Sequence, residues 1–226
     1  GPDLCPAWFA VTDRAFNLAL AQTAPGGTLR DAVAAVLAQP GPDAAGRAAQ
    51  IRARWREASL PDELTATVVA AYAALADGDG SPARVAIRSS SCDEDTEAAM
   101  RAGEFETYLN VSGDGALLAH LRLTWAGLWS EQALHSRAVD PGAPAWPRGG
   151  LIVQRMVESR VSGVVQTVNV ARGDLGELVI NAGLGLGEGV VSGLTPADLV
   201  TVVKPRPADA GPLQFNYLTA EKPLQV

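Results

Sequence analysis

The sequence predicts an α+β protein of two lobes, with a helix-rich first half and a sheet-rich second half. Residues 1–138 hold several alanine-rich segments with apolar residues at helical spacing. Residues 150–226 instead hold short runs of β-branched residues separated by turns. Residues 139–149 are rich in proline and glycine, which indicates a linker between two sublobes of a single domain that spans 1–226.

The first half is expected to open with a short strand and to continue with helices. "AWFAVT" at 7–12 predicts a buried strand, and Thr12 with Asp13 can cap the helix that follows. Pro61 fits the first turn of a helix, where its missing N–H costs nothing. The helices are predicted where alanine, arginine and apolar residues repeat at helical spacing, over 14–22, 28–39, 44–58 and 59–75.

A further strand and a long helix complete the first half. "VAI" at 85–87 predicts a strand that runs into Arg88, and 114–138 predicts one helix because it has no internal breaker. The strands of the second half are expected in "LIVQRMV", "SGVVQTVNV", "GELVINAG" and "ADLVTVVK". The glycine-rich stretch "GLGLGEGVVSG", 183–193, predicts a turn or a loop between two of them.

Composition narrows the class of protein. The chain has 226 residues, 47% of them hydrophobic and 19% charged, which is typical of a folded globular protein. A formal net charge of −7 argues against nucleic-acid binding, which needs a basic surface. No apolar run is long enough for a membrane span and no signal peptide is evident, so we expect a soluble, cytoplasmic protein. Cys5 and Cys92 make neither a disulfide framework nor a zinc site.

Arg88 stands at the end of a predicted strand and is followed by three serines. A guanidinium beside hydroxyls and turn amides can bind a polyphosphate through charge-assisted hydrogen bonds. It can equally pair with Asp93 or Asp95 while the serines cap the next helix. Residue types alone leave both readings of Arg88 open.

Two further motifs are ambiguous in the same way. The glycine run at 183–193 lets backbone approach a ligand closely, but it lacks the dinucleotide fingerprint and the lysine of a P-loop. Gln154 is a polar residue in an otherwise apolar strand. Its amide can satisfy a neighbouring backbone group or read the edge of a base.

The order of these motifs along the chain resembles that of one protein family. The stretches that carry the resemblance are "CPAWFAVTDRAF", "SLPDELTATVVAAY", "VAIRSSSCDED", "RAGEFETYLNV", "LTWAGLWSEQALHSR", "LIVQRMVESRVSGVV" and "LVINAGLGLGEGVVSGLTPADLVTVVK". Together they are similar to the N-terminal nucleotide-binding domain of the phosphoenolpyruvate synthase and pyruvate phosphate dikinase family, which includes rifampicin phosphotransferases. The resemblance implies an ATP-grasp fold, in which ATP lies between two α+β lobes.

The resemblance implies three residues that bind phosphate. Arg88 matches the family arginine that contacts the phosphates of ATP. Gly103 and Thr107 match the loop that closes over those phosphates, where glycine permits close approach and the hydroxyl donates.

It also implies four residues nearer the base and the sugar. Gln154 and the backbone around Met156 and Val157 match the hinge that reads adenine. Glu188 matches a residue that lines the nucleotide cleft, with a ribose-binding or structural role.

Parts of the family pattern lie outside this sequence. The family usually has a lysine in a "KGANL"-like segment before the first strand, and a metal-binding "DIEW"-like segment followed by "LQxRP" near its end. We therefore expect a fold that is incomplete at both ends. The sequence assigns no catalytic residue, and it leaves the metal ligands unknown. Glu104 and Asn169–Val170 also differ from the family's usual glutamine and acid–proline pair.

The function implied is the ATP-binding domain of a dikinase-type phosphotransferase that uses ATP and Mg²⁺. In the complete enzyme a phosphoryl group passes through the histidine of a swivelling domain to pyruvate or another hydroxyl acceptor, and this chain alone is expected to be inactive. The alternative is a non-catalytic module of the same fold that senses a nucleotide or binds a partner. The ligand expected for the phosphotransferase domain, and for a module that senses a nucleotide, is a small-molecule nucleotide.

Overall fold

The computed structural model describes residues 5–24, 26–41, 43–76, 78–90, 107–139, 146–193, 196–204 and 213–220. Their helices and antiparallel sheets confirm the predicted α+β class. The chain divides into two compact units, Gly1–Met156 and Val157–Val226. None of the helices in the described ranges is long and apolar enough to cross a membrane.

The first unit is built on a four-stranded antiparallel sheet in the order β1-β6-β4-β5. Its strands are β1 (Trp8–Val11), β4 (Val85–Ser90), β5 (Thr107–Val111) and β6 (Gly150–Arg155). β6 follows the expected linker 139–149, yet it pairs with β1 and β4. The division between the two units consequently falls after Met156 and not within 139–149.

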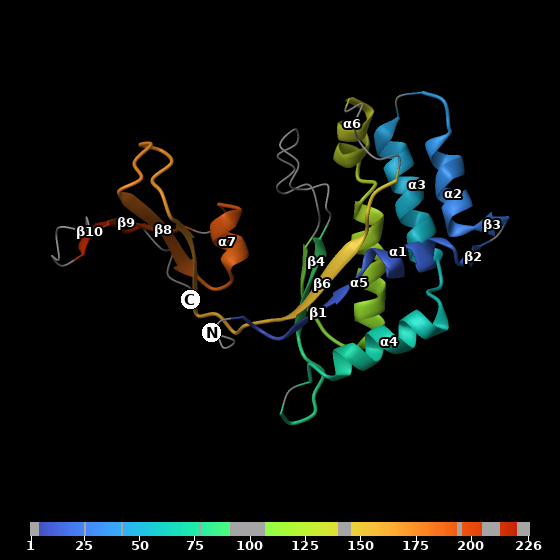
Figure 1. The fold of residues 1–226 in the computed structure, drawn as a ribbon, viewed down its shortest axis with the longest axis horizontal. Helices are drawn as coiled ribbons and strands as arrows, with labels where there is room; N and C mark the ends of the chain where they lie inside the picture. Colours follow the sequence, from blue (N-terminus) through green and yellow to red (C-terminus); the bar gives the residue numbers. More distant parts are fainter. Residues whose placement is uncertain are drawn as a thin grey trace. The chain divides into compact units, whose positions relative to one another are not determined.

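Helices gather on one side of this sheet (Figure 1). They are α1 (Asp13–Leu20), α2 (Leu29–Leu37), α3 (Ala44–Glu57), α4 (Asp62–Ala73), α5 (Asp114–Gly127) and α6 (Glu131–Val139), with a small hairpin of β2 (Thr23–Ala24) and β3 (Gly27–Thr28) before α2. Thr28 begins α2 with a capping box: its hydroxyl and its backbone N–H donate to Asp31, whose own N–H donates back to the hydroxyl.

The single helix expected over 114–138 is wrong, because α5 ends at Gly127 and α6 begins at Glu131. Leu128 and Trp129 between them are buried in the core. Ser130 then caps the new helix, since its hydroxyl accepts a hydrogen bond from the Ala133 N–H at 3.2 Å. Burial of two large side chains and a local cap thus favour two helices over one.

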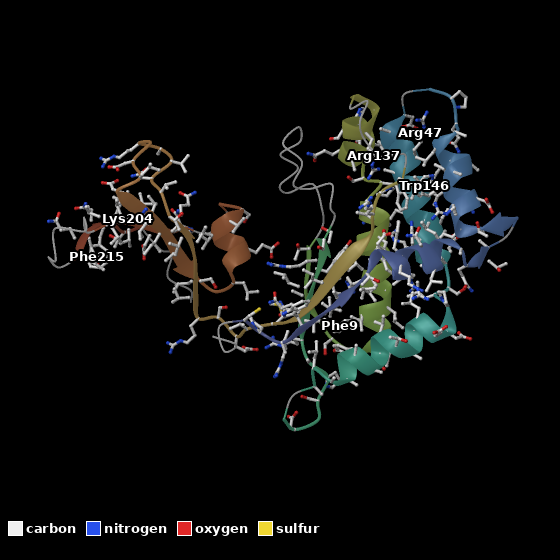
Figure 2. All side chains as sticks on the ribbon, in the orientation of Figure 1. Phe9, Arg47, Arg137, Trp146, Lys204 and Phe215 are labelled. Atoms are coloured by element: carbon white, nitrogen blue, oxygen red, sulfur yellow. The ribbon has the colours of Figure 1, made fainter. Side chains whose placement is uncertain are left out.

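Aromatic side chains fill the centre of the first unit. Phe16, Trp55, Trp125 and Trp129 are buried and lie with ring centroids 5.6 to 6.1 Å apart. Trp146, labelled in Figure 2, packs edge-on against Trp129 at 5.9 Å.

Gly149 ties the start of β6 to this core. Trp125 donates its indole N–H to the Gly149 carbonyl at 2.7 Å, and the Gly149 N–H donates to the Asp13 carboxylate at 3.0 Å. A Cβ at residue 149 would lie only 2.4 Å from the Phe16 ring, so this close approach requires glycine.

The second unit is an antiparallel meander in the order β10-β9-β8-β7. Its elements are β7 (Val161–Gln166), β8 (Glu177–Leu184), α7 (Gly187–Val191), β9 (Asp198–Val203) and β10 (Gln214–Leu218). α7 packs against β7 and β8.

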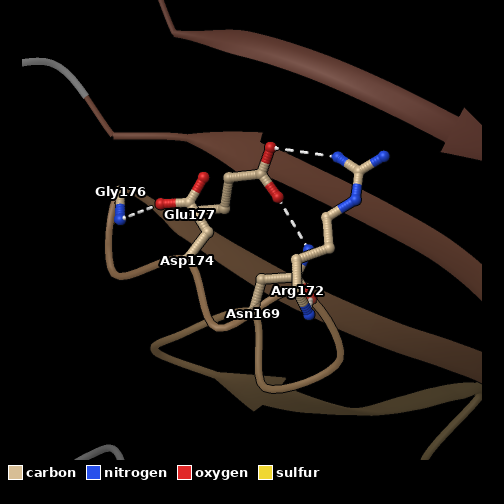
Figure 3. A network of polar contacts seen from close by, with 5 residues as sticks. All are labelled: Asn169, Arg172, Asp174, Gly176 and Glu177. Carbon is tan, nitrogen blue, oxygen red and sulfur yellow. Dashed lines mark hydrogen bonds and ion pairs between the residues drawn. The ribbon is translucent and has the colours of Figure 1, made fainter.

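A polar network closes the turn between β7 and β8 (Figure 3). Asn169 and Glu177 are buried, at 7% and 8% exposure, and the Asn169 amide donates to the Glu177 carboxylate at 2.7 Å. Arg172 lies 3.5 Å from the other Glu177 oxygen, and Asp174 accepts from the Gly176 N–H at 2.7 Å. The ammonium group of Lys204, labelled in Figure 2, donates to the carbonyls of Thr167 and Leu175.

Candidate functional site

The sheet of the first unit has one covered face and one open face. Side chains alternate along a strand, and directly opposite residues on antiparallel strands point to the same side. On β6, Leu151 and Val153 are buried, whereas Ile152 and Gln154 are half-buried. α5 contacts β4 and β5 on the covered side. The opposite side, which we call the open face, is formed by the exposed Trp8, Ala10, Arg88 and Thr107, the half-buried Ile152 and Gln154, and the buried Ala86.

Arg88 lies in the middle of the open face. It is the fourth residue of β4 and pairs with Thr107 on one side and with Ile152 on the other. Its side chain is exposed, and the described residues offer its guanidinium no hydrogen-bond or ion-pair partner. Asp93 and Asp95, its alternative partners, lie outside the described residues, as does Gly103.

Thr107 reaches the open face because of an irregularity in β5. The register shifts by one residue between Val85 and Ile87, and Asn110 has a left-handed backbone with φ of 56°. Without the extra residue, Tyr108 would lie opposite Arg88. With it, Tyr108 faces the core, where its ring centroid lies 4.8 Å from that of His120 on α5, and Thr107 lies opposite Arg88.

Gln154 lies on the same face, two strands away from Thr107. Its register partners are Trp8 on β1 and Ala86 on β4. The side chain is half-buried, and its amide nitrogen lies 3.7 Å from the sulfur of Cys5.

Met156 and Val157 follow β6 directly. The Met156 N–H donates to the Arg84 carbonyl at 2.8 Å, which extends the pairing of β6 with the β4 side of the sheet. Val157 is exposed and is the first residue of the second unit. The predicted adenine hinge therefore coincides with the point at which the chain passes from one unit to the other.

Glu188 is an exposed residue of the second unit, and its surroundings differ from the loop expected there. Within the glycine-rich stretch 183–193, residues Gly187–Val191 form the short helix α7. Gly185, at φ of 81°, makes the turn before the helix, and its carbonyl accepts from the Ser162 hydroxyl at 2.6 Å. The structure thus brings Arg88, Thr107 and Gln154 onto one sheet face, whereas Val157 and Glu188 belong to the other unit.

One prominent residue of the open face, Trp8, was not predicted from the sequence. β1 was expected to be buried, but it is an edge strand, and Trp8 remains 54% exposed. The alternation of Trp8, Phe9, Ala10 and Val11 does not reveal which face is covered, because all four residues are apolar.

Mg²⁺ at a nucleotide site is usually bound by one or two carboxylates together with phosphate oxygens and water. No group of three or more histidine, cysteine, aspartate or glutamate side chains within the described ranges is placed to hold a metal ion. The metal ligands therefore stay unassigned in this part of the chain.

Comparison with known proteins adds to this geometry. Residues 4–219 match the family described as "Pyruvate phosphate dikinase, AMP/ATP-binding domain". The chain belongs to this family. Its ATP-grasp-like fold agrees with the α+β architecture of the two units.

Two enzymes are similar to this chain over most of its length. A rifampicin phosphotransferase from a Streptomyces species is 37% identical over 199 residues, which are 87% of this chain and 22% of that protein. A phosphoenolpyruvate synthase from Aeropyrum pernix is 32% identical over 201 residues, which are 88% of this chain and 24% of that protein. The chain thus spans less than a quarter of the length of these two relatives.

Proposed function

We propose that this chain binds ATP as the nucleotide-binding domain of a dikinase-type phosphotransferase. The observation that supports the proposal is the open face, where a cation, a hydroxyl and an amide lie on one side of one sheet. Arg88, Thr107 and Gln154 supply these three groups. They suit the two ends of a nucleotide, since phosphates need positive charge and donors while a base needs a donor–acceptor pair.

Arg88 and Thr107 form the phosphate end of the proposed site. Side chains of directly opposite residues on antiparallel strands begin about 4.5–5.5 Å apart at their Cβ atoms. The guanidinium of Arg88 and the hydroxyl of Thr107 can therefore donate to the same phosphate group. Among the described residues the Arg88 guanidinium has no hydrogen-bond or ion-pair partner, which supports that role.

Gln154 and Met156 form the base end. The Gln154 amide can both donate and accept, which matches the edge of adenine. The Met156 N–H is already bonded to Arg84, so we assign the Met156 carbonyl, and not its N–H, to the adenine amino group. Contributions of Gly103, Val157 and Glu188 to nucleotide binding stay predictions from the family resemblance.

In the complete enzyme, the phosphoryl group would leave an oxygen of the nucleotide and bond to a histidine nitrogen of a swivelling domain, before it passes to pyruvate or another hydroxyl acceptor. The residues of this chain bind and orient the nucleotide for that step, and orientation is a large part of phosphoryl-transfer catalysis. The family resemblance also implies Mg²⁺. The roles proposed for Arg88, Thr107, Gln154 and Met156 are direct contacts of their own hydrogen-bonding groups with the nucleotide.

The phosphate role is tested by Arg88→Ala, with ATP and adenosine titrated in parallel by calorimetry. A hydrogen bond to a charged group contributes about 1.5–3 kcal/mol, so the variant should bind ATP about 10- to 100-fold more weakly. Adenosine affinity should change little, because adenosine carries no phosphate. Arg88→Lys should restore part of the ATP affinity, since lysine keeps the charge but not the planar fork.

Arg56→Ala is the matched control, because Arg56 is an exposed arginine on α3, in the helical layer. It should bind ATP like the parent chain. Equal losses for ATP and adenosine in Arg88→Ala, accompanied by a lower melting temperature without ligand, would mean that Arg88 is a structural brace. ATP binding without phosphoryl transfer by the complete protein would favour the non-catalytic module.

A further inference from the structure

Trp8 differs from the other tryptophans of this chain. The sequence has five, and Trp55, Trp125, Trp129 and Trp146 pack against one another or against Phe16 in the core of the first unit. Trp8 alone is 54% exposed, and no described aromatic ring stacks on it. Exposure of so large an apolar side chain to water is unfavourable, so a role for Trp8 in binding a ligand on the open face would explain its position.

The position of Trp8 relative to the proposed site is set by strand register. Trp8 lies directly opposite Gln154, so its indole and the Gln154 amide stand side by side on the open face. Arg88 lies two strands across and two residues along the sheet from Trp8. With strands about 4.8 Å apart and about 3.3 Å per residue, their Cα atoms are separated by roughly 12 Å.

This layout places a flat aromatic surface and an amide at one end of the open face, and a cation with a hydroxyl at the other. A nucleoside triphosphate has the same polarity, because its ribose separates an aromatic base from its phosphates. Indole faces stack well on purines, and the contact does not compete with hydrogen bonds made at the edge of the base.

We propose that the Trp8 indole stacks on the purine base of the bound nucleotide while Gln154 reads the edge of that base. The proposal rests on the proposed function and assigns to that site a base-binding residue on the edge strand β1. Trp8 thereby contributes affinity for the base and none for the phosphates.

The experiment measures binding of ATP and of inorganic tripolyphosphate to the parent chain, Trp8→Ala, Trp8→Leu and Trp8→Phe. Stacking of one base on an aromatic side chain corresponds to about a 5- to 100-fold change in affinity. Trp8→Ala and Trp8→Leu should lose ATP affinity by that factor and keep their affinity for tripolyphosphate. Trp8→Phe should keep most of its affinity for both ligands. The leucine variant separates stacking from apolar contact, because leucine is apolar but has no aromatic face.

The outcomes separate this inference from the proposed function. If the parent chain binds ATP, Arg88→Ala weakens it and Trp8→Ala does not, the role of Trp8 is overturned and the nucleotide site stands. Equal losses of ATP and tripolyphosphate in Trp8→Ala would also overturn it, since they indicate that Trp8 supports the sheet. If the parent chain binds neither ligand, both proposals fall.

Discussion

The two units of this chain are stabilised in different ways. The first has an apolar core in which aromatic rings and aliphatic side chains from the helices pack on one face of the sheet. In the second unit Val179 and Val202 are the buried aliphatic side chains of the described strands, and β10 is exposed along its length. Its best-buried polar contact is the Asn169–Glu177 hydrogen bond in the β7–β8 turn. Apolar burial thus dominates the first unit, whereas strand pairing and a polar turn are more important in the second.

The largest effect is expected from Trp125→Ala. Trp125 is fully buried and bonded to Gly149, and truncation of a buried tryptophan costs about 3–5 kcal/mol of unfolding free energy. Hydrogen exchange should show the loss in residues 1–156, while protection of β7, β8 and β9 stays unchanged. Trp8→Ala is the control and should leave unfolding nearly unaffected because Trp8 is exposed. Equal loss of protection in both units would show that they unfold as one.

A smaller effect, confined to the second unit, is expected from Glu177→Ala. The variant leaves the buried Asn169 amide without its acceptor, which costs about 1–3 kcal/mol. Arg172→Ala removes only the exposed partner of Glu177. The Arg172 side chain is 71% exposed, so this variant should lose less than about 1 kcal/mol of unfolding free energy. Urea unfolding combined with hydrogen exchange of β7 and β8 measures both. A Glu177→Ala variant as stable as Arg172→Ala would contradict a stabilising role for the network.

The smallest effect concerns acid stability at the start of α2 in the first unit. The hydrogen bond from the Thr28 hydroxyl, followed by that from the Thr28 N–H, lowers the pKa of Asp31 below its usual value of 3.8. A carboxylate whose pKa is lower in the folded than in the unfolded state stabilises the fold at pH values above its unfolded-state pKa. This stabilisation is lost as the pH falls through the folded-state pKa. The melting temperature of the parent chain should therefore fall slightly more below about pH 4 than that of Asp31→Asn. If the melting temperatures of the two proteins fell by the same amount from about pH 6 to about pH 3, a stabilising role for this cap would be contradicted.

Local patterns in the sequence predicted much of the secondary structure but not the long-range pairing. Helical spacing located α2, α3 and α4, since an amphipathic helix depends on near neighbours in the chain. The place of β6 in the first sheet could not be predicted, because 139–149 reads as a boundary and the pairing partners of a strand depend on tertiary packing. The same limit explains the break at Ser130, which depends on burial of Leu128 and Trp129.

For the candidate site, residue types indicated Arg88 and Gln154, and the family resemblance added Thr107 and supplied the expected roles of all three. That they share one face follows from strand register, and for Thr107 from the one-residue shift in β5. A shift of this kind has no reliable local signal beyond an asparagine that tolerates a left-handed backbone. The exposure of Trp8 likewise depends on β1 being an edge strand, which the letters "AWFAVT" do not reveal.

The position of β6 has a consequence for synthesis of the chain on the ribosome. β1 and β4 emerge early, but neither can pair with the other, because β6 lies between them and is made last. Until residue 155 has left the exit tunnel, β4 can pair only with β5, and β1 lacks its partner strand beside helices that can already form. A stop codon within 139–149 would therefore release a chain with a gap at the centre of its sheet, whereas one after Met156 would release a first unit with all four strands.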